Sequence, residues 1–118
     1  MRHKRHKHTL GVSPSHRQSM IKNLAVELID HGQIKTTATR CRALRPFIEK
    51  LVTIAKVDSI ANRRLVYSKI NNKTAVKQLF ESVAPKFKTR PGGYIRITKL
   101  ADVRMGDAAI MSTIGFVE

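Results

Sequence analysis

The sequence predicts an α+β fold, in which about four helices pack on a small three-stranded sheet behind a basic, extended N-terminal arm. Apolar residues recur at helical spacing through most of the chain. Apolar and polar residues then alternate near the C-terminus, as they do in half-buried strands. The first seventeen residues are rich in cations and poor in apolar side chains. We therefore expect an RNA-binding arm at residues 1–14 and a globular domain at residues 15–118.

The composition bounds both the size and the partner of the protein. A chain of 118 residues suffices for one domain with a modest core. Lys and Arg number 23 against 8 acidic residues, a formal charge of +15 that is typical of nucleic-acid binders. The single cysteine, Cys41, excludes an intrachain disulfide and favours a reducing, cytoplasmic location. No apolar run is long enough to span a membrane, so we expect no membrane association.

The first helix is predicted at residues 15–31. Ser15 and Gln18 have the spacing of a capping box, in which two side chains satisfy backbone groups at the helix start. Apolar residues from Met20 to Ile29 recur at helical spacing and form one stripe. Gly32 suits the left-handed position that ends a helix. We expect the stripe to make this helix the centre of the core.

A short strand at residues 33–37 leads into the second helix. The strand is Thr-rich and alternates around Ile34. Thr37 or Thr39 caps the helix, whose apolar positions continue to Ala55. Pro46 lies within this pattern and lacks a backbone donor, which predicts either a kink or a later start.

Two further helices and two strands complete the expected fold. Ser59 caps a third helix at residues 59–69, and a fourth helix ends at Pro85. Residues 86–93 form a basic loop, in which glycines allow a sharp turn or a close approach to phosphate. Strands are expected at residues 94–100 and 109–117. In the first of these, the pattern places Ile95 on the buried side and Tyr94 on the opposite side.

The distribution of cations favours binding to the backbone of folded RNA. Phosphate recognition needs many cations, together with a rigid body that fixes their register. Arginines cluster at the start of the second helix and on the third, and further cations surround the glycine loop and the last hairpin. Aromatic residues are only 5%, fewer than a single-strand binder built on stacking would need. The expected partner is therefore duplex-rich RNA.

The sequence shows no enzyme or cofactor site. His3, His6 and His8 are of the type that binds zinc or copper, but no Cys or acidic residue accompanies them in the arm. Arg40 and Arg42 flank Cys41 and favour its thiolate, yet no base or oxyanion site is visible. We expect no catalysis, no metal, no cofactor and no small-molecule substrate.

Six segments resemble, in order, the family of bacterial large-subunit ribosomal protein seventeen. The resemblance covers nearly the whole chain and departs from the family pattern at Pro46, Ile95 and Ile110. It implies a structural role in the large ribosomal subunit, with binding to large-subunit rRNA near the rim of the peptide exit tunnel and beside neighbouring ribosomal proteins. The segments are Met1-Arg2-His3-Lys4, Ser15-His16-Arg17-Gln18, Ile34-Lys35-Thr36-Thr37, Asn62-Arg63-Arg64-Leu65, Gly92-Gly93-Tyr94-Ile95-Arg96-Ile97 and Gly106-Asp107-Ala108-Ala109.

The expected RNA contacts come from the arm, the starts of the first two helices, the third helix, the glycine loop and the last hairpin. A DNA-compacting protein would use the same charge, and an amphipathic first helix also suits a membrane-active protein. The candidate residues are Arg2, His3, Lys4, Arg5, His6, Lys7, His8, Ser15, His16, Arg17, Arg40, Arg63, Arg64, Lys86, Arg90, Gly92, Gly93, Tyr94, Arg96 and Arg104.

Overall fold

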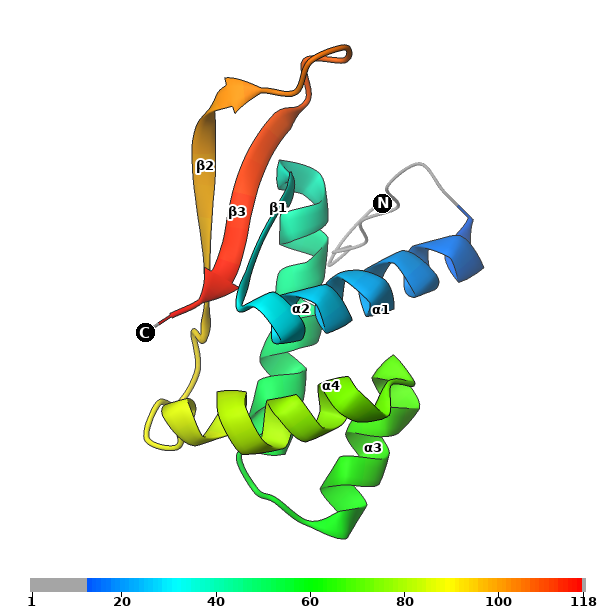
Figure 1. Cartoon of the computed structure of the whole chain (residues 1–118), viewed down its shortest axis with the longest axis vertical. Coiled ribbons are helices and arrows are strands. Elements are labelled where there is room, and N and C mark those ends of the chain that lie inside the picture. Colours follow the sequence, from blue (N-terminus) through cyan, green and yellow to red (C-terminus); the bar gives the residue numbers. More distant parts are fainter. Residues whose placement is uncertain (1–12, 118) are drawn as a thin grey trace, which may run out of the picture.

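A computed structural model describes residues 13–117 and confirms the predicted α+β class. Four α-helices and a three-stranded sheet follow one another along the chain (Figure 1). The elements are α1 (Pro14–His31), β1 (Gln33–Thr37), α2 (Ala38–Ala55), α3 (Ile60–Ile70), α4 (Lys73–Gln78), β2 (Ile95–Val103) and β3 (Ile110–Phe116).

The sheet has the strand order β1-β3-β2, and β3 pairs antiparallel with both neighbours. Ile114 at its centre lies opposite Ile34 on one side and Ile97 on the other. All three side chains pack into the core between the sheet and the helices, and Ile114 is fully buried. The alternate positions form an open outer face, because side chains on neighbouring positions of a strand point to opposite sides.

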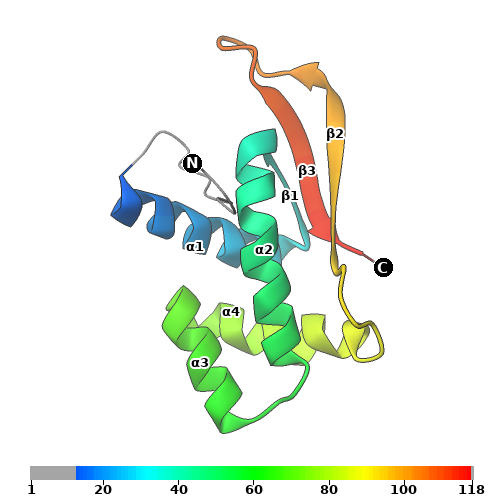
Figure 2. The same cartoon turned by 180° about the vertical axis from the view of Figure 1, so that it is seen from behind.

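α2, rather than α1, is the centre of the core. It packs against all three strands, and α1 crosses it on the other side (Figures 1 and 2). Six residues of α2 are buried, whereas α1 buries only Ala25, Leu28 and Ile29. Our expectation for α1 was wrong because only the C-terminal half of its stripe is fully buried, whereas Ile21 and Leu24 are half-buried at the edge of the core. The buried residues of α2 are Cys41, Leu44, Ile48, Leu51, Val52 and Ala55.

The helix starts follow local capping rules, with one correction. The side chains of Thr37 and Ser59 cap α2 and α3 as predicted. α1 is capped by Ser13, not Ser15, and the Ser13 Oγ accepts from the His16 backbone N–H at 3.4 Å. Pro14 decides this register, since its fixed φ and missing N–H suit the first helical position. Ser15 is an exposed residue of the first turn.

α2 begins at Ala38 and runs through Pro46, so the alternative of a later helix start is wrong. The fourth helical segment also continues past its predicted end at Pro85. After α4 the chain forms a π-helical turn at Leu79–Val83 and a 3-10 turn at Ala84–Phe87. Pro85 lies in the first turn of this last segment, where its missing N–H costs no helical hydrogen bond.

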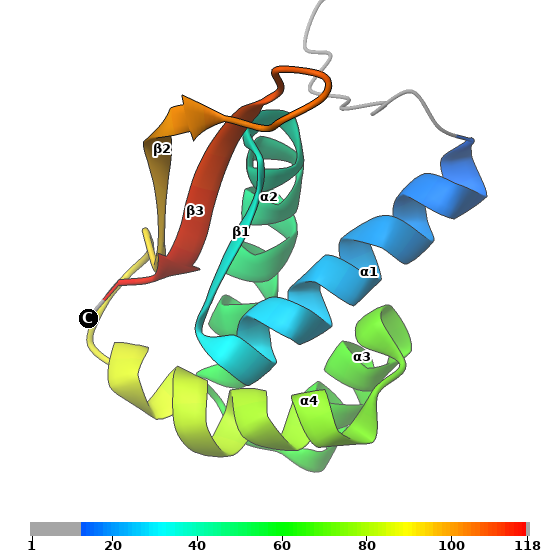
Figure 3. The same cartoon turned by 45° about the horizontal axis from the view of Figure 1, so that its top comes forward.

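β2 extends beyond its predicted end near Leu100, because β3 continues to pair with it as far as Val103 and Ile110. The register shifts between Lys99 and Val103, and the β2–β3 hairpin projects beyond the helices (Figures 1 and 3). Met105 in the connecting turn is 96% exposed. The alternating pattern missed this extension because hairpin pairing supplies backbone hydrogen bonds without burying side chains.

Glu49 of α2 fixes the start of β2 against the helix. Its two carboxylate oxygens each accept a backbone N–H, from Tyr94 and from Ile95, both at 3.2 Å. The ring of Phe87 packs against Tyr94 and Phe116 at centroid distances of 5.3 and 6.1 Å. The loop between the 3-10 turn and β2 is thereby anchored at both ends.

Candidate nucleic-acid interface

The expected arm contacts lie outside the residues that the structure describes. These contacts are Arg2, His3, Lys4, Arg5, His6, Lys7 and His8. The described chain begins at Ser13, which caps α1, and His16 is exposed in the first turn. Arg17 is half-buried beside α2. The attachment point of the arm is thus a capped helix start that contains further cationic or titratable side chains.

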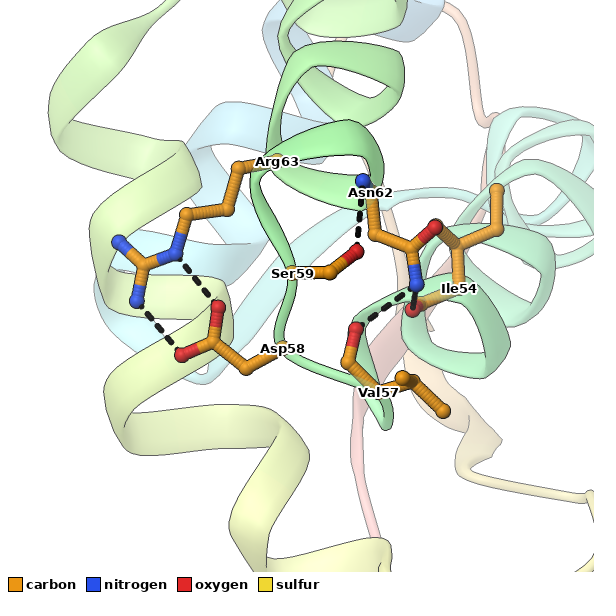
Figure 4. A network of polar contacts seen from close by, with 6 residues as sticks. All are labelled: Ile54, Val57, Asp58, Ser59, Asn62 and Arg63. Atoms are coloured by element: carbon orange, nitrogen blue, oxygen red, sulfur yellow. Dashed lines mark hydrogen bonds and ion pairs between the residues drawn. The ribbon is translucent and has the colours of Figure 1, made fainter.

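Arg63 is held inside the turn between α2 and α3 (Figure 4). Its Nε and Nη2 donate to the two carboxylate oxygens of Asp58 at 2.7 and 2.8 Å. Its guanidinium also lies 5.1 Å from the centre of the Phe80 ring. The hydrogen bonds from Arg63 lower the pKa of Asp58, which keeps the carboxylate charged. Arg63 therefore stabilises the fold, and its side chain remains 35% exposed.

Asn62 completes the same turn (Figure 4). Its side-chain amide donates to the carbonyl oxygens of Ile54 at 3.2 Å and Val57 at 2.8 Å. These bonds satisfy the Ile54 carbonyl group in the last turn of α2 and the Val57 carbonyl group in the turn that follows. The adjacent Arg64 is exposed. Of the two arginines in this motif, Arg64 is the more exposed to a polyanion.

Two other predicted contacts also bond within the chain. The guanidinium of Arg104 binds the Asp107 carboxylate across the hairpin turn, and this lowers the pKa of Asp107 to about 2. Arg90 donates to the Gly93 carbonyl oxygen at 3.0 Å. Gly93 has a φ of +64°, so the glycine serves a turn. Both arginines remain exposed and can still face phosphate with their outer edges.

Tyr94 belongs to the core and does not lie on the outer sheet face. Its side chain is fully buried although the strand pattern places it opposite Ile95. Tyr94 precedes the first paired residue of β2, so the alternation of the strand does not apply to it. Its hydroxyl oxygen lies 3.3 Å from Thr53 Oγ1 and 3.1 Å from Lys56 Nζ, and these contacts lower its pKa. Tyr94 is therefore not a candidate RNA contact.

The remaining predicted contacts lie on several faces. Lys86 is exposed on the 3-10 turn, and Arg40 is half-buried in the first turn of α2. Arg96 is exposed on the open face of the sheet beside Thr98 and Thr113. The register places Lys35 of β1 on the same face, directly opposite Thr113. This cation was not among our candidates, although its even spacing from Gln33 in the strand indicated the same face.

A second set of cations was missed because it depends on packing between helices. Lys22, Lys50 and Lys69 surround a groove between α1, α2 and α3, together with Arg17. Each helix contributes one stripe of side chains at helical spacing to this groove. The stripe on α1 is formed by residues 17, 18, 21 and 22, and the stripe on α2 by residues 43, 46, 47 and 50. Each stripe is visible in the sequence, but their meeting is not.

Cys41 is buried, and its Sγ lies 3.8 Å from the Ser112 carbonyl oxygen. Burial raises the pKa of the thiol and outweighs the opposite effect of Arg42. Among residues 13–117, no cluster of three or more His, Cys, Asp or Glu residues is placed to hold a metal ion. No helix within the same residues is both long and apolar enough to cross a membrane.

Comparison with known proteins then decides the family. The model of the family "Ribosomal protein L17" matches residues 20–117. Large ribosomal subunit protein bL17 of Neorickettsia sennetsu is 52% identical over 118 residues, which cover 99% of this chain and 100% of the relative. This chain belongs to the ribosomal protein L17 family. The bL17 proteins of Rickettsia africae and Methylacidiphilum infernorum are 49% and 48% identical over all of this chain, and the matches cover 86% and 89% of those relatives.

Membership of the L17 family confirms several predictions made from the sequence. The family consists of structural ribosomal components, so the chain is a ribosomal protein of the translation apparatus and not an enzyme. Its place in the cytoplasmic ribosome follows from the same membership. The DNA-compacting and membrane-active alternatives have no support from these relatives.

Proposed function

We propose that the chain is a structural constituent of the large ribosomal subunit that binds large-subunit rRNA and supports subunit assembly. The observation that favours this most is full-length identity of about one half to proteins named large ribosomal subunit protein bL17. The formal charge of +15 suits a polyanionic partner. The position near the peptide exit tunnel rim and the contacts with neighbouring ribosomal proteins are part of the proposal, and rest on the family resemblance.

The use of acidic residues supports this assignment. Asp58 and Asp107 pair with Arg63 and Arg104, and Glu49 accepts backbone N–H groups at β2. These carboxylates have partners within the fold, and many cations among residues 13–117, such as Arg64, Lys86 and Arg96, are exposed. Exposed cations on many sides suit a protein that is surrounded by rRNA better than one that grips a single duplex from one side.

The part of the arm that precedes the α1 cap, residues 1–12, is proposed to extend this contact along the rRNA backbone. Deletion of residues 1–12 should weaken binding to a large-subunit rRNA fragment while residues 13–118 still melt cooperatively. The slope of log affinity against log salt should become shallower by about 0.7–0.9 for each phosphate that the shortened protein no longer neutralises. Fluorescence anisotropy over a series of NaCl concentrations measures both quantities, and circular dichroism checks folding.

The matched control replaces the four arm cations Arg2, Lys4, Arg5 and Lys7 by glutamine, which keeps the chain length. It should reproduce the effect of the deletion. Unchanged affinity in both variants contradicts the role of the arm. Equal affinity for random duplex DNA, together with failure to sediment with large subunits, would favour the DNA-compacting alternative.

A further inference from the structure

The groove between α1, α2 and α3 has the size of a ligand site. Its volume is about 570 Å³, within the range of about 300–1,000 Å³ that ligand pockets occupy. α1 crosses α2 so that the N-terminal end of α1 stands away from it (Figures 1 and 3). The half-buried side chains of Ile21 and Phe47 line the groove between them.

The groove combines an apolar floor with a rim of one charge. Ile21 and Phe47 pack against the core and also line the groove. Around them lie the cations Arg17, Lys22, Lys50 and Lys69, and no acidic residue of the described chain is among the lining side chains. Four cations around an apolar floor repel one another, and an anion bound between them relieves this repulsion.

We propose that this groove binds one unpaired nucleotide of RNA, with its base against Phe47 and the flanking phosphates between the four cations. The proposal rests on the proposed function and adds a defined subsite to it. RNA loops and bulges present unstacked bases that proteins bind on aromatic side chains. Aromatic stacking does not depend on base identity, so the subsite reads an unpaired position in the RNA and no particular sequence.

The connection to the arm favours RNA over an acidic protein segment. Arg17 lies in the first turns of α1, and the basic stretch at residues 2–8 precedes this helix in the chain. A strand that follows the arm therefore reaches the groove at its Arg17 end. The first acidic residue of the whole chain is Glu27, so from the arm to the groove α1 offers one sign of charge to a polyanion.

The experiment compares the full-length protein on three RNA hairpins: one with a single bulged adenosine, one with an abasic bulge, and one fully paired. The wild type should bind the adenosine bulge at least about fivefold more tightly than the abasic bulge, the lower limit for stacking one base on an aromatic side chain. Phe47→Leu keeps an apolar floor but removes the ring. It should abolish this preference and leave the affinity for fully paired RNA unchanged.

Tyr67→Leu is the matched control, because it removes an exposed ring of α3 that does not line this groove. This variant should keep the preference. If Phe47→Leu has a lowered melting temperature, a second variant tests the subsite. This variant is Lys50→Glu, at an exposed position of the rim. It should weaken binding to the adenosine bulge more than binding to the paired hairpin.

Each other outcome overturns the inference in a recognisable way. Salt-sensitive binding to all three hairpins with no preference for the adenosine bulge rejects the subsite but keeps the proposed function. No binding to any RNA rejects both. A preference that persists in Phe47→Leu places the base elsewhere. An acidic, aromatic peptide could bind the wild type but not Phe47→Leu, while the bulged RNA shows no difference between the two proteins. In that case the groove is a protein-binding site instead.

Discussion

Adjacent arginines on α3 have different surroundings and therefore different expected roles. Arg63 binds Asp58 through two hydrogen bonds and packs over Phe80, whereas Arg64 is exposed. Arg63→Ala should lower the melting temperature, because it removes the bidentate contact that closes the turn between α2 and α3. Arg64→Ala should leave the melting temperature unchanged and weaken rRNA binding. Thermal melts and anisotropy titrations of both variants test the two roles, and a reversed result would contradict them.

The carboxylate of Asp107 provides a prediction about pH. Arg104, and secondly the Ala109 backbone N–H, lower its pKa from 3.8 to about 2. A pKa that is depressed in the folded state stabilises the hairpin turn above about pH 4, and this contribution is lost as the pH falls toward 2. NMR titration of the side-chain carboxyl carbon should give a midpoint near 2. In Arg104→Gln the midpoint should move up toward 3.8. A wild-type midpoint already near 3.8 would contradict the contact between Arg104 and Asp107 in solution.

At the scale of elements, the end of α1 depends on one glycine. Gly32 has a φ of +78°, and its backbone N–H donates to the Leu28 carbonyl oxygen at 2.7 Å. Gly32→Ala should destabilise the protein by about 1 kcal/mol, since an L-residue is strained there. Beyond its chain neighbours, no heavy atom of residues 13–117 lies within 4 Å of the added Cβ, so backbone strain is the main expected cost.

Gly92→Ala is the control for this change. Gly92 also has open space around its Cβ position but does not have a positive φ. Chemical denaturation of the two variants should therefore give a loss of stability for Gly32→Ala alone. Equal effects would show that general loop properties, and not the left-handed backbone, decide the outcome.

Sequence patterns predicted the elements whose signals are local. Thr37 and Ser59 cap their helices and Gly32 ends α1, because each signal involves only a few neighbouring residues. The errors concern features that tertiary structure decides. Tyr94 is buried because it contacts α2 and Phe87, and β2 is longer because β3 pairs with it.

The candidate contacts divide in the same way. Exposure of Arg64 and Arg96 agrees with the expected binding surface, but the ion pairs of Arg63 and Arg104 could not be read from the sequence. Each pair joins residues that a turn brings together in a particular conformation. The cations of the groove were not predicted for a related reason. Arg17 and Lys50 line the same groove only because α1 crosses α2.

At the scale of the whole molecule, the positive charge should make salt act in opposite directions on folding and on binding. The formal charge of +15 destabilises the folded chain through repulsion between its cations. Raising the NaCl concentration screens this repulsion, so the melting temperature of the free protein should rise. Over the same range, affinity for rRNA should fall steeply because the release of counterions becomes less favourable. Thermal melts and anisotropy titrations in matched buffers measure both trends.

The Gln variant of Arg2, Lys4, Arg5 and Lys7 serves as the control for this prediction. With fewer cations, its melting temperature should rise less with NaCl, and its binding should show a shallower salt dependence. Because NaCl also affects apolar burial, the comparison between the two proteins isolates the electrostatic part of the change. A wild-type melting temperature that falls with NaCl, or rises equally in both proteins, would mean that repulsion from the arm does not limit the stability of the free protein.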